Sequence, residues 1–299
     1  MVFLVNPASG AGSTGRRWPE IAHRAAGVGL SGDALFSERP GHLSELARTA
    51  AGNGARLLVV VGGDGSVNEV VNGIAGLAAQ PELAILPRGT GWDFVRTFPI
   101  PRRVEDAASV ALEGKVRAID LGRARYRAWD GSEAESLFAN VASAGMSGAV
   151  AQRADSSSKA LGGKASFLWA TLAVFARWKN TDVSVEADGE RRQGSMLDVI
   201  VANGQFLGGG MWMTPEADPA DGFFDVLLIG DITKWDLVTT LPKIYRGRHL
   251  PHRKAELLRA GRVSVETPVP LPVELDGEQP GTTPATFEVV PGALRLRVP

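Results

Sequence analysis

Short aliphatic runs alternate with helical spacing of apolar residues through the first 120 positions of the chain. The runs span residues 2–5, 57–61 and 83–86, a length typical of buried strands. Between them, apolar residues recur with i, i+3, i+4, i+7 spacing at positions 43, 46, 47 and 50, and again at 67, 70, 71 and 74. This alternation predicts βα units around a parallel sheet. The second helix is predicted to begin at Ser66, which would form a capping box with Glu69.

After residue 120 the pattern changes to alternating strands separated by Gly, Pro and Asp turns. Strands are predicted at 182–186, 196–202, 223–229, 262–266, 272–275, 286–290 and 294–298. Helices are expected at 164–179 and 234–246, the latter bent or split by Pro242. A chain of 299 residues is also longer than one core usually serves. We therefore expect a second, β-rich domain.

Composition narrows the classes of protein that remain. Lys+Arg 32 against Asp+Glu 33 gives a net charge of -1, so no global attraction to nucleic acid or to an anionic bilayer is expected. The absence of cysteine excludes disulfides, thiolate catalysis and cysteine metal sites, and is compatible with the cytosol. The apolar stretch at 167–176 is shorter than the about 20 residues of a spanning helix, and the N-terminal run is too short for a signal peptide. No transmembrane segment is predicted.

Three of the predicted strands end in loops whose residues suit phosphate binding. The loops are Asn6-Pro7-Ala8-Ser9-Gly10, Gly62-Gly63-Asp64-Gly65-Ser66 and Pro87-Arg88-Gly89-Thr90-Gly91-Trp92-Asp93. Loops after successive parallel strands emerge at one edge of the sheet, so the three are expected to converge. Glycines let the main chain approach a phosphate, and helix N-termini offer free N–H groups. Because Asp64 and Asp93 would repel phosphates, a divalent cation such as Mg²⁺ is implied between them.

Two other phosphate motifs compete for the first loop. Residues 10–15 spell G-x-G-x-x-G, and Asp33 lies near the position of a ribose-binding acid, as in a dinucleotide fold. There the first glycine follows the strand directly, whereas residues 6–9 intervene here and the other two loops are left unexplained. A Walker A loop is excluded because Arg16 and Arg17 replace its Lys-Ser/Thr pair.

The motifs together resemble those of the diacylglycerol kinase-type lipid kinases, which include bacterial diacylglycerol kinases, YegS-like kinases and sphingosine kinases. They are VNPASG (5–10), VGGDGSVNEVVNG (61–73), PRGTGWDFVRT (87–97), DLG (120–122), FANV (138–141), VANGQFLGGG (201–210), DGFFDV (221–226) and LDGE (275–278). The resemblance implies an α/β ATP-binding domain made of residues 1–122 and 286–299. A β-rich, sandwich-like lipid domain would comprise residues 123–285, with the active site in the cleft between the domains.

The same resemblance assigns roles to individual residues. The implied ATP contacts are Asn6, Pro7, Ala8, Ser9, Gly10, Gly62, Gly63, Asp64, Gly65, Ser66, Val67, Asn68 and Thr90, with Ser37 as a looser match. The implied ligands of catalytic Mg²⁺ are Asp64, Asp93 and Asp120, and those of a second, structural Mg²⁺ are Asp218, Asp221 and Phe223. Asp218 and Phe223 would donate main-chain oxygens. Glu278 matches the general base.

Some positions leave alternatives open. Asp188-Gly189-Glu190 repeats the tripeptide that contains Glu278, and the later copy is chosen because it precedes the terminal strands. Trp92 stands where the family usually has Asn, which removes an amide that could bind nucleotide or a neighbouring loop. Arg88 adds a charge that could reach a phosphate or point to solvent.

The resemblance predicts an ATP- and Mg²⁺-dependent kinase that transfers the γ-phosphate to the hydroxyl of diacylglycerol or a related lipid alcohol. Alternatives are an NAD kinase or another soluble-acceptor kinase, and a non-catalytic lipid- or nucleotide-binding protein. Apolar residues 167, 168, 169, 172 and 175 could line an acyl path or form ordinary core, and basic residues 246–254 could dock on anionic headgroups or be solvated. We expect a cytoplasmic protein, transiently membrane-associated, that takes its lipid from a membrane surface and binds no nucleic acid; a homodimer stays open.

Overall fold

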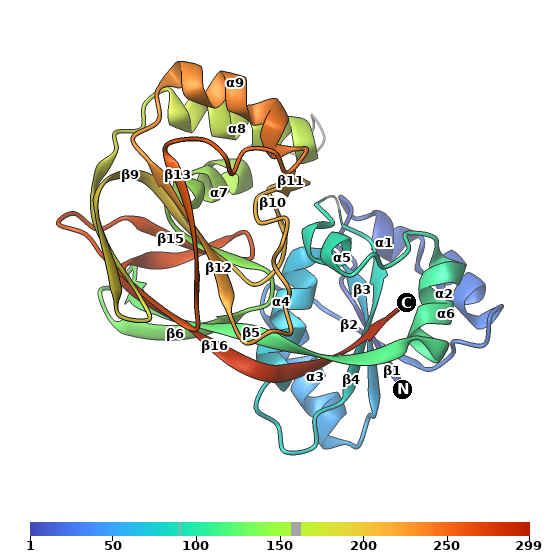
Figure 1. Ribbon diagram of the computed structural model, residues 1–299. Coiled ribbons are helices and arrows are strands. Elements are labelled where there is room, and N and C mark those ends of the chain that lie inside the picture. Colours follow the sequence, from blue (N-terminus) through green and yellow to red (C-terminus); the bar gives the residue numbers. More distant parts are fainter. Residues whose placement is uncertain (90, 157–162) are drawn as a thin grey trace. The chain divides into compact units, whose positions relative to one another are not determined.

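The computed structural model describes residues 1–89, 91–156 and 163–299 (Figure 1). The chain forms two compact units: unit 1 is Met1–Ile119 with Gly292–Pro299, and unit 2 is Asp120–Pro291. Unit 1 contains β1 (Val2–Val5), α1 (Ser13–Arg16), α2 (Trp18–Ala26), β2 (Asp33–Phe36), α3 (His42–Gly52), β3 (Leu57–Gly62), α4 (Asp64–Ile74), β4 (Glu82–Pro87), α5 (Asp93–Thr97) and α6 (Val104–Glu113). The unit boundaries fall within two long strands, β5 (Lys115–Ala128) and β16 (Glu278–Val298).

The sheet of unit 1 is parallel, as the sequence predicts. Its strand order is β16-β4-β3-β1-β2, with the last residues of β16 pairing beside β4. The predicted strands at 2–5, 57–61 and 83–86 and the predicted helices over 43–50 and 67–74 are confirmed. Alternate strand residues such as Val5 and Val61 face a buried cluster with Ile21 of α2 and Ala108 of α6. Because all strands run in parallel, the loops after β1, β3 and β4 lie at one edge.

The predicted capping box at Ser66 is wrong. Helix α4 begins two residues earlier, at Asp64, with Gly63 as its N-cap and no side-chain capping hydrogen bond. Ser66 Oγ instead accepts a hydrogen bond from Asn6 Nδ2 at 2.9 Å, and Glu69 Oε2 accepts one from the Leu43 backbone N–H at 3.0 Å. Glu69 therefore caps the first turn of α3, a neighbouring helix. Periodicity alone does not reveal this tertiary bond.

Unit 2 is β-rich, as predicted. Its elements after β5 are β6 (Glu133–Phe138), β7 (Val141–Gly145), α7 (Met146–Ser156), α8 (Gly163–Phe175), β8 (Thr181–Ala187), β9 (Glu190–Ala202), β10 (Phe206–Leu207), β11 (Met211–Trp212), β12 (Phe224–Gly230), α9 (Lys234–Ile244), β13 (Ala255–Ala260), β14 (Arg262–Glu266), β15 (Pro272–Leu275) and most of β16. Strand pairing runs in a closed circuit β7-β15-β16-β14-β8-β9, and β12 and β13 extend it from β9. Apolar side chains of these strands, among them Phe138, Phe224 and Phe287, form its largest core cluster.

Two details of unit 2 differ from the sequence prediction. Residues 286–290 and 294–298 are not separate strands but parts of β16, which continues through Pro291 and Gly292. The strand pairing continues although Gly292 adopts a left-handed φ of 59°, which glycine accommodates without a steric clash. The second predicted helix ends at Ile244 and carries Pro242 within its last turn. Among the described residues, no helix is both long and apolar enough to cross a membrane.

Candidate phosphate-binding site and catalytic residues

The glycine-rich loops after β1, β3 and β4 meet in unit 1. Asn6 Nδ2 connects the first loop to Ser66 on the second, and the Arg88 backbone N–H donates to the Gly62 carbonyl at 2.7 Å. A Cβ added to Gly89 would lie 2.5 Å from Gly63 Cα, so two backbones touch where any larger residue would clash. A Cβ on Gly10 would likewise lie 2.9 Å from the Arg88 carbonyl oxygen. The predicted convergence of the loops is therefore present in the structure.

Asp64 fixes the third loop to the start of α4. Its Oδ2 accepts a hydrogen bond from the Trp92 backbone N–H at 2.9 Å, and its Oδ1 accepts one from the Phe94 backbone N–H at 3.0 Å. Trp92 is the N-cap of α5 and has a φ of 68°, a left-handed conformation in which Asn is several-fold favoured over bulky residues. The Arg102 guanidinium lies 4.6 Å from the Trp92 ring centroid and covers it. The tryptophan that departs from the family motif thus keeps the main-chain bond to Asp64.

Carboxylates and cations line the same edge of unit 1. A Cβ on Gly91 would lie 2.7 Å from Asp64 Oδ2 and 3.7 Å from Asp93 Oδ2, so both oxygens point to one small region. Asp93 is buried, and Arg96 Nε is 3.8 Å from its Oδ1. Burial, followed by the nearby charge of Arg17, lowers the pKa of Arg88. A cation destabilised in this way is a candidate contact for an anion.

Hard oxygen donors of this kind fit Mg²⁺. Within the described part of the chain, no group of three or more His, Asp or Glu side chains is close enough to hold a metal ion. Mg²⁺, however, is commonly held by one or two carboxylates together with substrate phosphates and water rather than by a protein cage. Asp64 and Asp93 could serve in that way, and the uncapped N-terminus of α4 beside them offers N–H groups to phosphate oxygens.

Two further predicted nucleotide contacts belong to the same unit. Ser37 follows β2 directly, and its backbone N–H donates to the Val5 carbonyl at 2.9 Å, which puts it at the edge of the sheet that carries Asn6. Ser9 Oγ donates to the Asn6 carbonyl at 2.9 Å and lies 2.7 Å from Thr14 Oγ1, so the first loop is closed internally. Thr90 lies outside the described residues. The roles of all these residues toward ATP stay predictions.

In unit 2, the structure brings Asp120 to the loop that contains the predicted structural metal ligands. The Asp120 backbone N–H donates to the Pro219 carbonyl at 2.6 Å, and Asp120 Oδ2 accepts from the Gly222 backbone N–H at 2.8 Å. The Asp218 carbonyl accepts the Ala220 backbone N–H at 2.7 Å, so this oxygen already takes part in the turn. Asp120 thus supports this loop through its main chain and its carboxylate.

Arg259 is the partner of the other two residues predicted for that metal. It forms an ion pair with the Asp221 carboxylate, and its guanidinium lies 5.0 Å from the Phe223 ring centroid. Phe223 also donates its backbone N–H to Asp221 Oδ1 at 3.0 Å. An arginine already neutralises the carboxylate, so a cation at Asp221 would have to compete with it. The assignment of a metal to Asp218, Asp221 and Phe223 stays a prediction.

Glu278 is the first residue of β16, immediately after the Asp276-Gly277 turn of the β15–β16 hairpin. Both turn residues have positive φ, 49° and 96°, as a two-residue hairpin requires. The Asp276 carboxylate accepts backbone N–H groups from Ala139, Asn140 and Val141 at 2.7 to 3.0 Å. The side chain of Glu278 is exposed at this well-anchored turn.

The earlier copy, Asp188-Gly189-Glu190, is also a hairpin turn with positive φ at its first two residues. Asp188 accepts the backbone N–H groups of Gly261 and Arg262, so both aspartates anchor their turns in the same way. The two copies differ in what lies behind them. Behind Glu278, the Gly277 backbone N–H donates to Glu274 Oε1 at 2.5 Å.

Sequence reasoning missed Glu274. Its side chain is 1% exposed, and Ser143 Oγ lies 3.1 Å from its Oε2. Burial, with smaller contributions from Asp276 and Asp198, raises the pKa of Glu274 to about 8, so the carboxyl is protonated at neutral pH. Burial also raises the pKa of Asp198, which accepts the Ser147 backbone N–H, to about 6. A glutamate between two apolar residues on a strand usually indicates an outward-facing position, so the strand pattern contains little sign of this burial.

Asn203 was also missed as a functional residue, although its motif, VANGQFLGGG, was noted. The side chain is 1% exposed, and its Nδ2 donates to the carbonyls of Asp120 and Ala139 at 2.8 Å each. Asn203 therefore connects Asp120 with residues 139–141, whose backbone N–H groups bind the Asp276 carboxylate. The sequence signal that points to Asn203 is an asparagine followed by Gly within the motif at 201–210.

The parallel sheet with three converging glycine-rich turns, joined to an antiparallel β unit, defines a two-domain kinase. Residues 1–124 match the family model of the diacylglycerol kinase catalytic domain. Residues 140–298 match that of the YegS C-terminal NAD kinase beta sandwich-like domain. The chain belongs to the diacylglycerol kinase family, and its class of activity is that of an ATP-dependent lipid kinase.

Individual relatives agree with this family. A diacylglycerol kinase of Staphylococcus carnosus is 28% identical over 285 residues, covering 95% of this chain and 90% of the relative. One from Staphylococcus aureus strain MRSA252 is 28% identical over the same length, covering 88% of the relative. A crystal structure of a protein assigned as a diacylglycerol kinase from Bacillus anthracis has a TM-score of 0.79 and 25% identity, covering 100% of this chain and 96% of that one.

Yeast NADH kinase in complex with NADH has a TM-score of 0.53 at 12% identity, covering 99% of this chain and 81% of that one. At this identity the likeness shows the fold alone. The predicted two-domain α/β and β-sandwich-like architecture and the predicted lipid kinase family are both confirmed.

Proposed function

We propose that the chain binds Mg²⁺-ATP at the converging loops of unit 1 and phosphorylates diacylglycerol or a closely related lipid alcohol. The observation that carries the proposal is the backbone contact of Gly63 with Gly89, together with the two hydrogen bonds that Asp64 accepts from the third loop. This arrangement needs glycine at both contact positions, and the N-terminus of α4 beside it offers main-chain N–H groups to phosphate oxygens. A dehydrogenase-type site at residues 10–15 would need neither.

Each residue group of unit 1 has a separate task in this proposal. The N-terminus of α4 and the first loop bind the phosphates through N–H groups, and Arg88 adds positive charge. Asp64 and Asp93 would hold the cation; Asp120, which belongs to unit 2, stays a ligand predicted from the family resemblance alone. When bound, Mg²⁺ would neutralise charge on the β- and γ-phosphates. Asp64 also keeps the third loop in position, so its loss is expected to damage both binding and turnover.

Unit 2 provides the acceptor chemistry. The oxygen of the lipid hydroxyl forms a bond to the γ-phosphorus while the bond from that phosphorus to the bridging oxygen of ADP breaks. The hydroxyl proton passes to the Glu278 carboxylate, which acts as the general base. Asp276 and Glu274 hold the turn that presents Glu278. The products are ADP and the lipid phosphate, and the proton returns to water when Glu278 ionises.

The acceptor is tested by offering purified protein γ-labelled ATP, Mg²⁺ and separate acceptors: diacylglycerol, a sphingoid base, ceramide, phosphatidylglycerol and NAD. We expect label on diacylglycerol in detergent micelles and none on NAD. Label on NAD alone would support a soluble-acceptor kinase instead. Label on no acceptor, with intact ATP binding, would favour a non-catalytic binding protein.

A further inference from the structure

Helix α9 of unit 2 exposes an apolar face to solvent. Its inward residues Leu237, Leu241 and Ile244 follow i, i+4, i+7 spacing and contribute to the clusters packed against β12 and neighbouring strands. Its outward residues include Trp235 and Val238, whose exposed fractions are 74% and 56%. A surface helix of a globular protein normally presents polar residues on the outward face. The inner apolar residues pack against the rest of unit 2 and so stabilise the fold. The exposed Trp235 and Val238 make no such contribution and need another explanation.

The end of α9 and the segment that follows it are strongly basic. Residues 234–254 contain Lys234, Lys243, Arg246, Arg248, Arg253 and Lys254, with Asp236 as the only carboxylate, in a chain whose net charge is -1. Tyr245, 40% exposed, lies among these basic residues. Basic residues beside exposed Trp and Tyr are typical of surfaces that meet the headgroup region of a bilayer.

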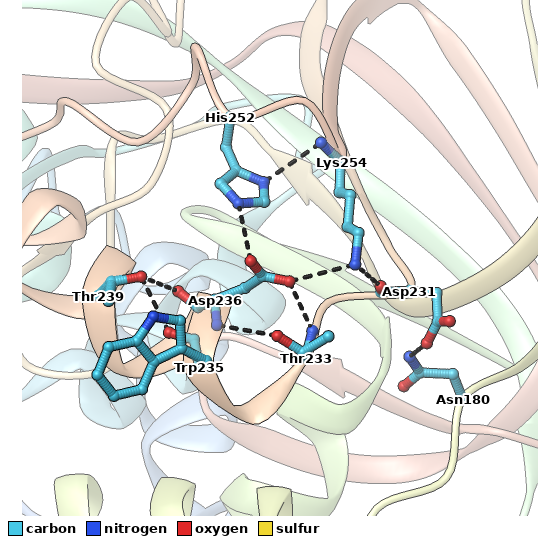
Figure 2. Close-up of polar contacts among 8 residues, drawn as sticks. All are labelled: Asn180, Asp231, Thr233, Trp235, Asp236, Thr239, His252 and Lys254. Carbon is cyan, nitrogen blue, oxygen red and sulfur yellow. Dashed lines mark hydrogen bonds and ion pairs between the residues drawn. The ribbon is translucent and has the colours of Figure 1, made fainter.

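The one carboxylate of the segment is already neutralised within it. Figure 2 shows that Asp236 forms a capping box with Thr233 and binds Lys254 and His252. Hydrogen bonds from Thr233, with Lys254 beside them, hold the pKa of Asp236 well below its usual range. Lys243, Arg246, Arg248 and Arg253 form no ion pair in the part of the chain that the structure describes. Their positive charge is available to an external anion.

Helix α8, which packs beside α9, also exposes apolar side chains. Ala170 and Phe175 of α8 share a buried cluster with Leu237 of α9, and the two helices lie side by side in unit 2 (Figure 1). On α8, Trp169 is 63% exposed and Leu172 is 38% exposed. Exposed apolar side chains of this size, when they form a continuous patch, commonly mark an interaction site.

We infer that the outward face of α9, with the basic residues that follow it, is a docking surface for an anionic lipid bilayer. Trp235 and Val238 enter the headgroup and acyl boundary, and Arg246 and Arg248 bind lipid phosphates. An acidic protein partner would match the charge but would not account for two exposed apolar side chains one helical turn apart, beside Tyr245. The inference rests on the proposed function, because a lipid kinase must meet a membrane to reach its acceptor. It goes beyond the proposed function by naming the surface that makes the contact.

Vesicle flotation tests the surface without any assay of turnover. Wild-type protein should bind phosphatidylcholine vesicles that contain phosphatidylglycerol, and bind vesicles of phosphatidylcholine alone much more weakly. R246Q/R248Q should lose about 25-fold in affinity, since each arginine near an anionic surface contributes about fivefold. The matched control R48Q/R56Q removes two exposed arginines of unit 1 and should bind normally. Equal losses in both double variants would overturn the inference.

The absence of cysteine allows a direct probe of insertion. Val238→Cys gives a single labelling position for a polarity-sensitive dye, and Val269→Cys, at a side chain 61% exposed, is the control. We expect a blue shift at position 238 on anionic vesicles and none at position 269. No shift at 238, or an equal shift at both, contradicts the inference. A shift at 238 that follows protein concentration without vesicles would assign the face to a second copy of the chain and likewise overturn it.

Activity separates this inference from the proposed function. If both hold, W235A/V238S should phosphorylate diacylglycerol in vesicles about tenfold more slowly than wild type and a short-chain, water-soluble diacylglycerol at the wild-type rate. Equal loss on both substrates would contradict a docking role. If wild type phosphorylates neither lipid yet still floats with anionic vesicles, the proposed function fails and the docking surface stands.

Discussion

Glu278 and Glu190 occupy the same place in two Asp-Gly-Glu hairpin turns, which gives the general base a matched control. Glu278→Gln should lower turnover by about a hundredfold or more, because a positioned general base typically contributes that much. ATP affinity should be unchanged, since Glu278 lies in unit 2 and the proposed phosphate contacts lie in unit 1. The check is steady-state turnover beside calorimetric ATP binding. Glu190→Gln should retain wild-type turnover; equal loss in both variants would remove Glu278 from the mechanism.

Glu274 makes a second residue-scale prediction, for stability against pH. Its pKa is raised from 4.5 to about 8 on folding, so the native state holds a proton that the unfolded state releases between those values. The contribution of Glu274 to the free energy of unfolding is therefore greatest below about pH 4.5 and is lost as the pH rises toward 8. Glu274→Gln stays neutral and keeps an acceptor for Gly277. Its free energy of unfolding relative to wild type should rise across this window.

Urea unfolding at about pH 5, 6.5 and 8 measures that difference, which should reach the order of a few kcal/mol at the upper end. Glu133→Gln, at a side chain 83% exposed, should show no comparable trend. A Glu274→Gln difference that is constant with pH would mean that the buried carboxyl does not titrate as inferred.

At the scale of elements, the glycine contact between the second and third loops carries the site. Gly89→Ala would put a Cβ 2.5 Å from Gly63 Cα, so the backbones must separate. We expect loss of measurable ATP binding with the fold retained, because the clash is confined to loop ends. Gly52→Ala, in α3 with no atom near the added Cβ, should bind ATP normally. Calorimetry and circular dichroism check both. Normal ATP binding by Gly89→Ala would mean that the contact is dispensable.

The elements that the sequence predicted share one property, a regular apolar pattern. The strands over 57–61 and 83–86 are continuous aliphatic runs because parallel strands are buried on both faces. β2 was missed because it has four residues and begins with an exposed aspartate at the sheet edge. β5 was missed because, over residues 123–128, Arg alternates mainly with Ala, which has a low strand propensity. Glu69 and Glu274 could not be assigned because their partners are distant in sequence and buried by tertiary packing.

At the scale of the whole molecule, the order of the motifs along the chain predicts the two-unit organisation. The chain passes from one unit to the other near residues 119 and 292, within the continuous strands β5 and β16. Only the second of these positions carries a turn dipeptide, Pro291-Gly292. The sequence located the three phosphate loops because glycine and aspartate are needed there for stated physical reasons. It could not show that Asp120 supports the loop of Asp218, since that depends on main-chain bonds within unit 2.

The central claim is that the turns after β1, β3 and β4 bind a metal-bound triphosphate. Isothermal titration of wild-type protein with ATP, in the presence and absence of Mg²⁺, tests it most directly, with Asp64→Asn as the paired variant. The account predicts saturable binding of Mg²⁺-ATP at one site, weaker binding without Mg²⁺, and strongly weakened binding by Asp64→Asn. Absence of Mg²⁺-ATP binding by folded wild-type protein, or tight binding of NADH in its place, would contradict it.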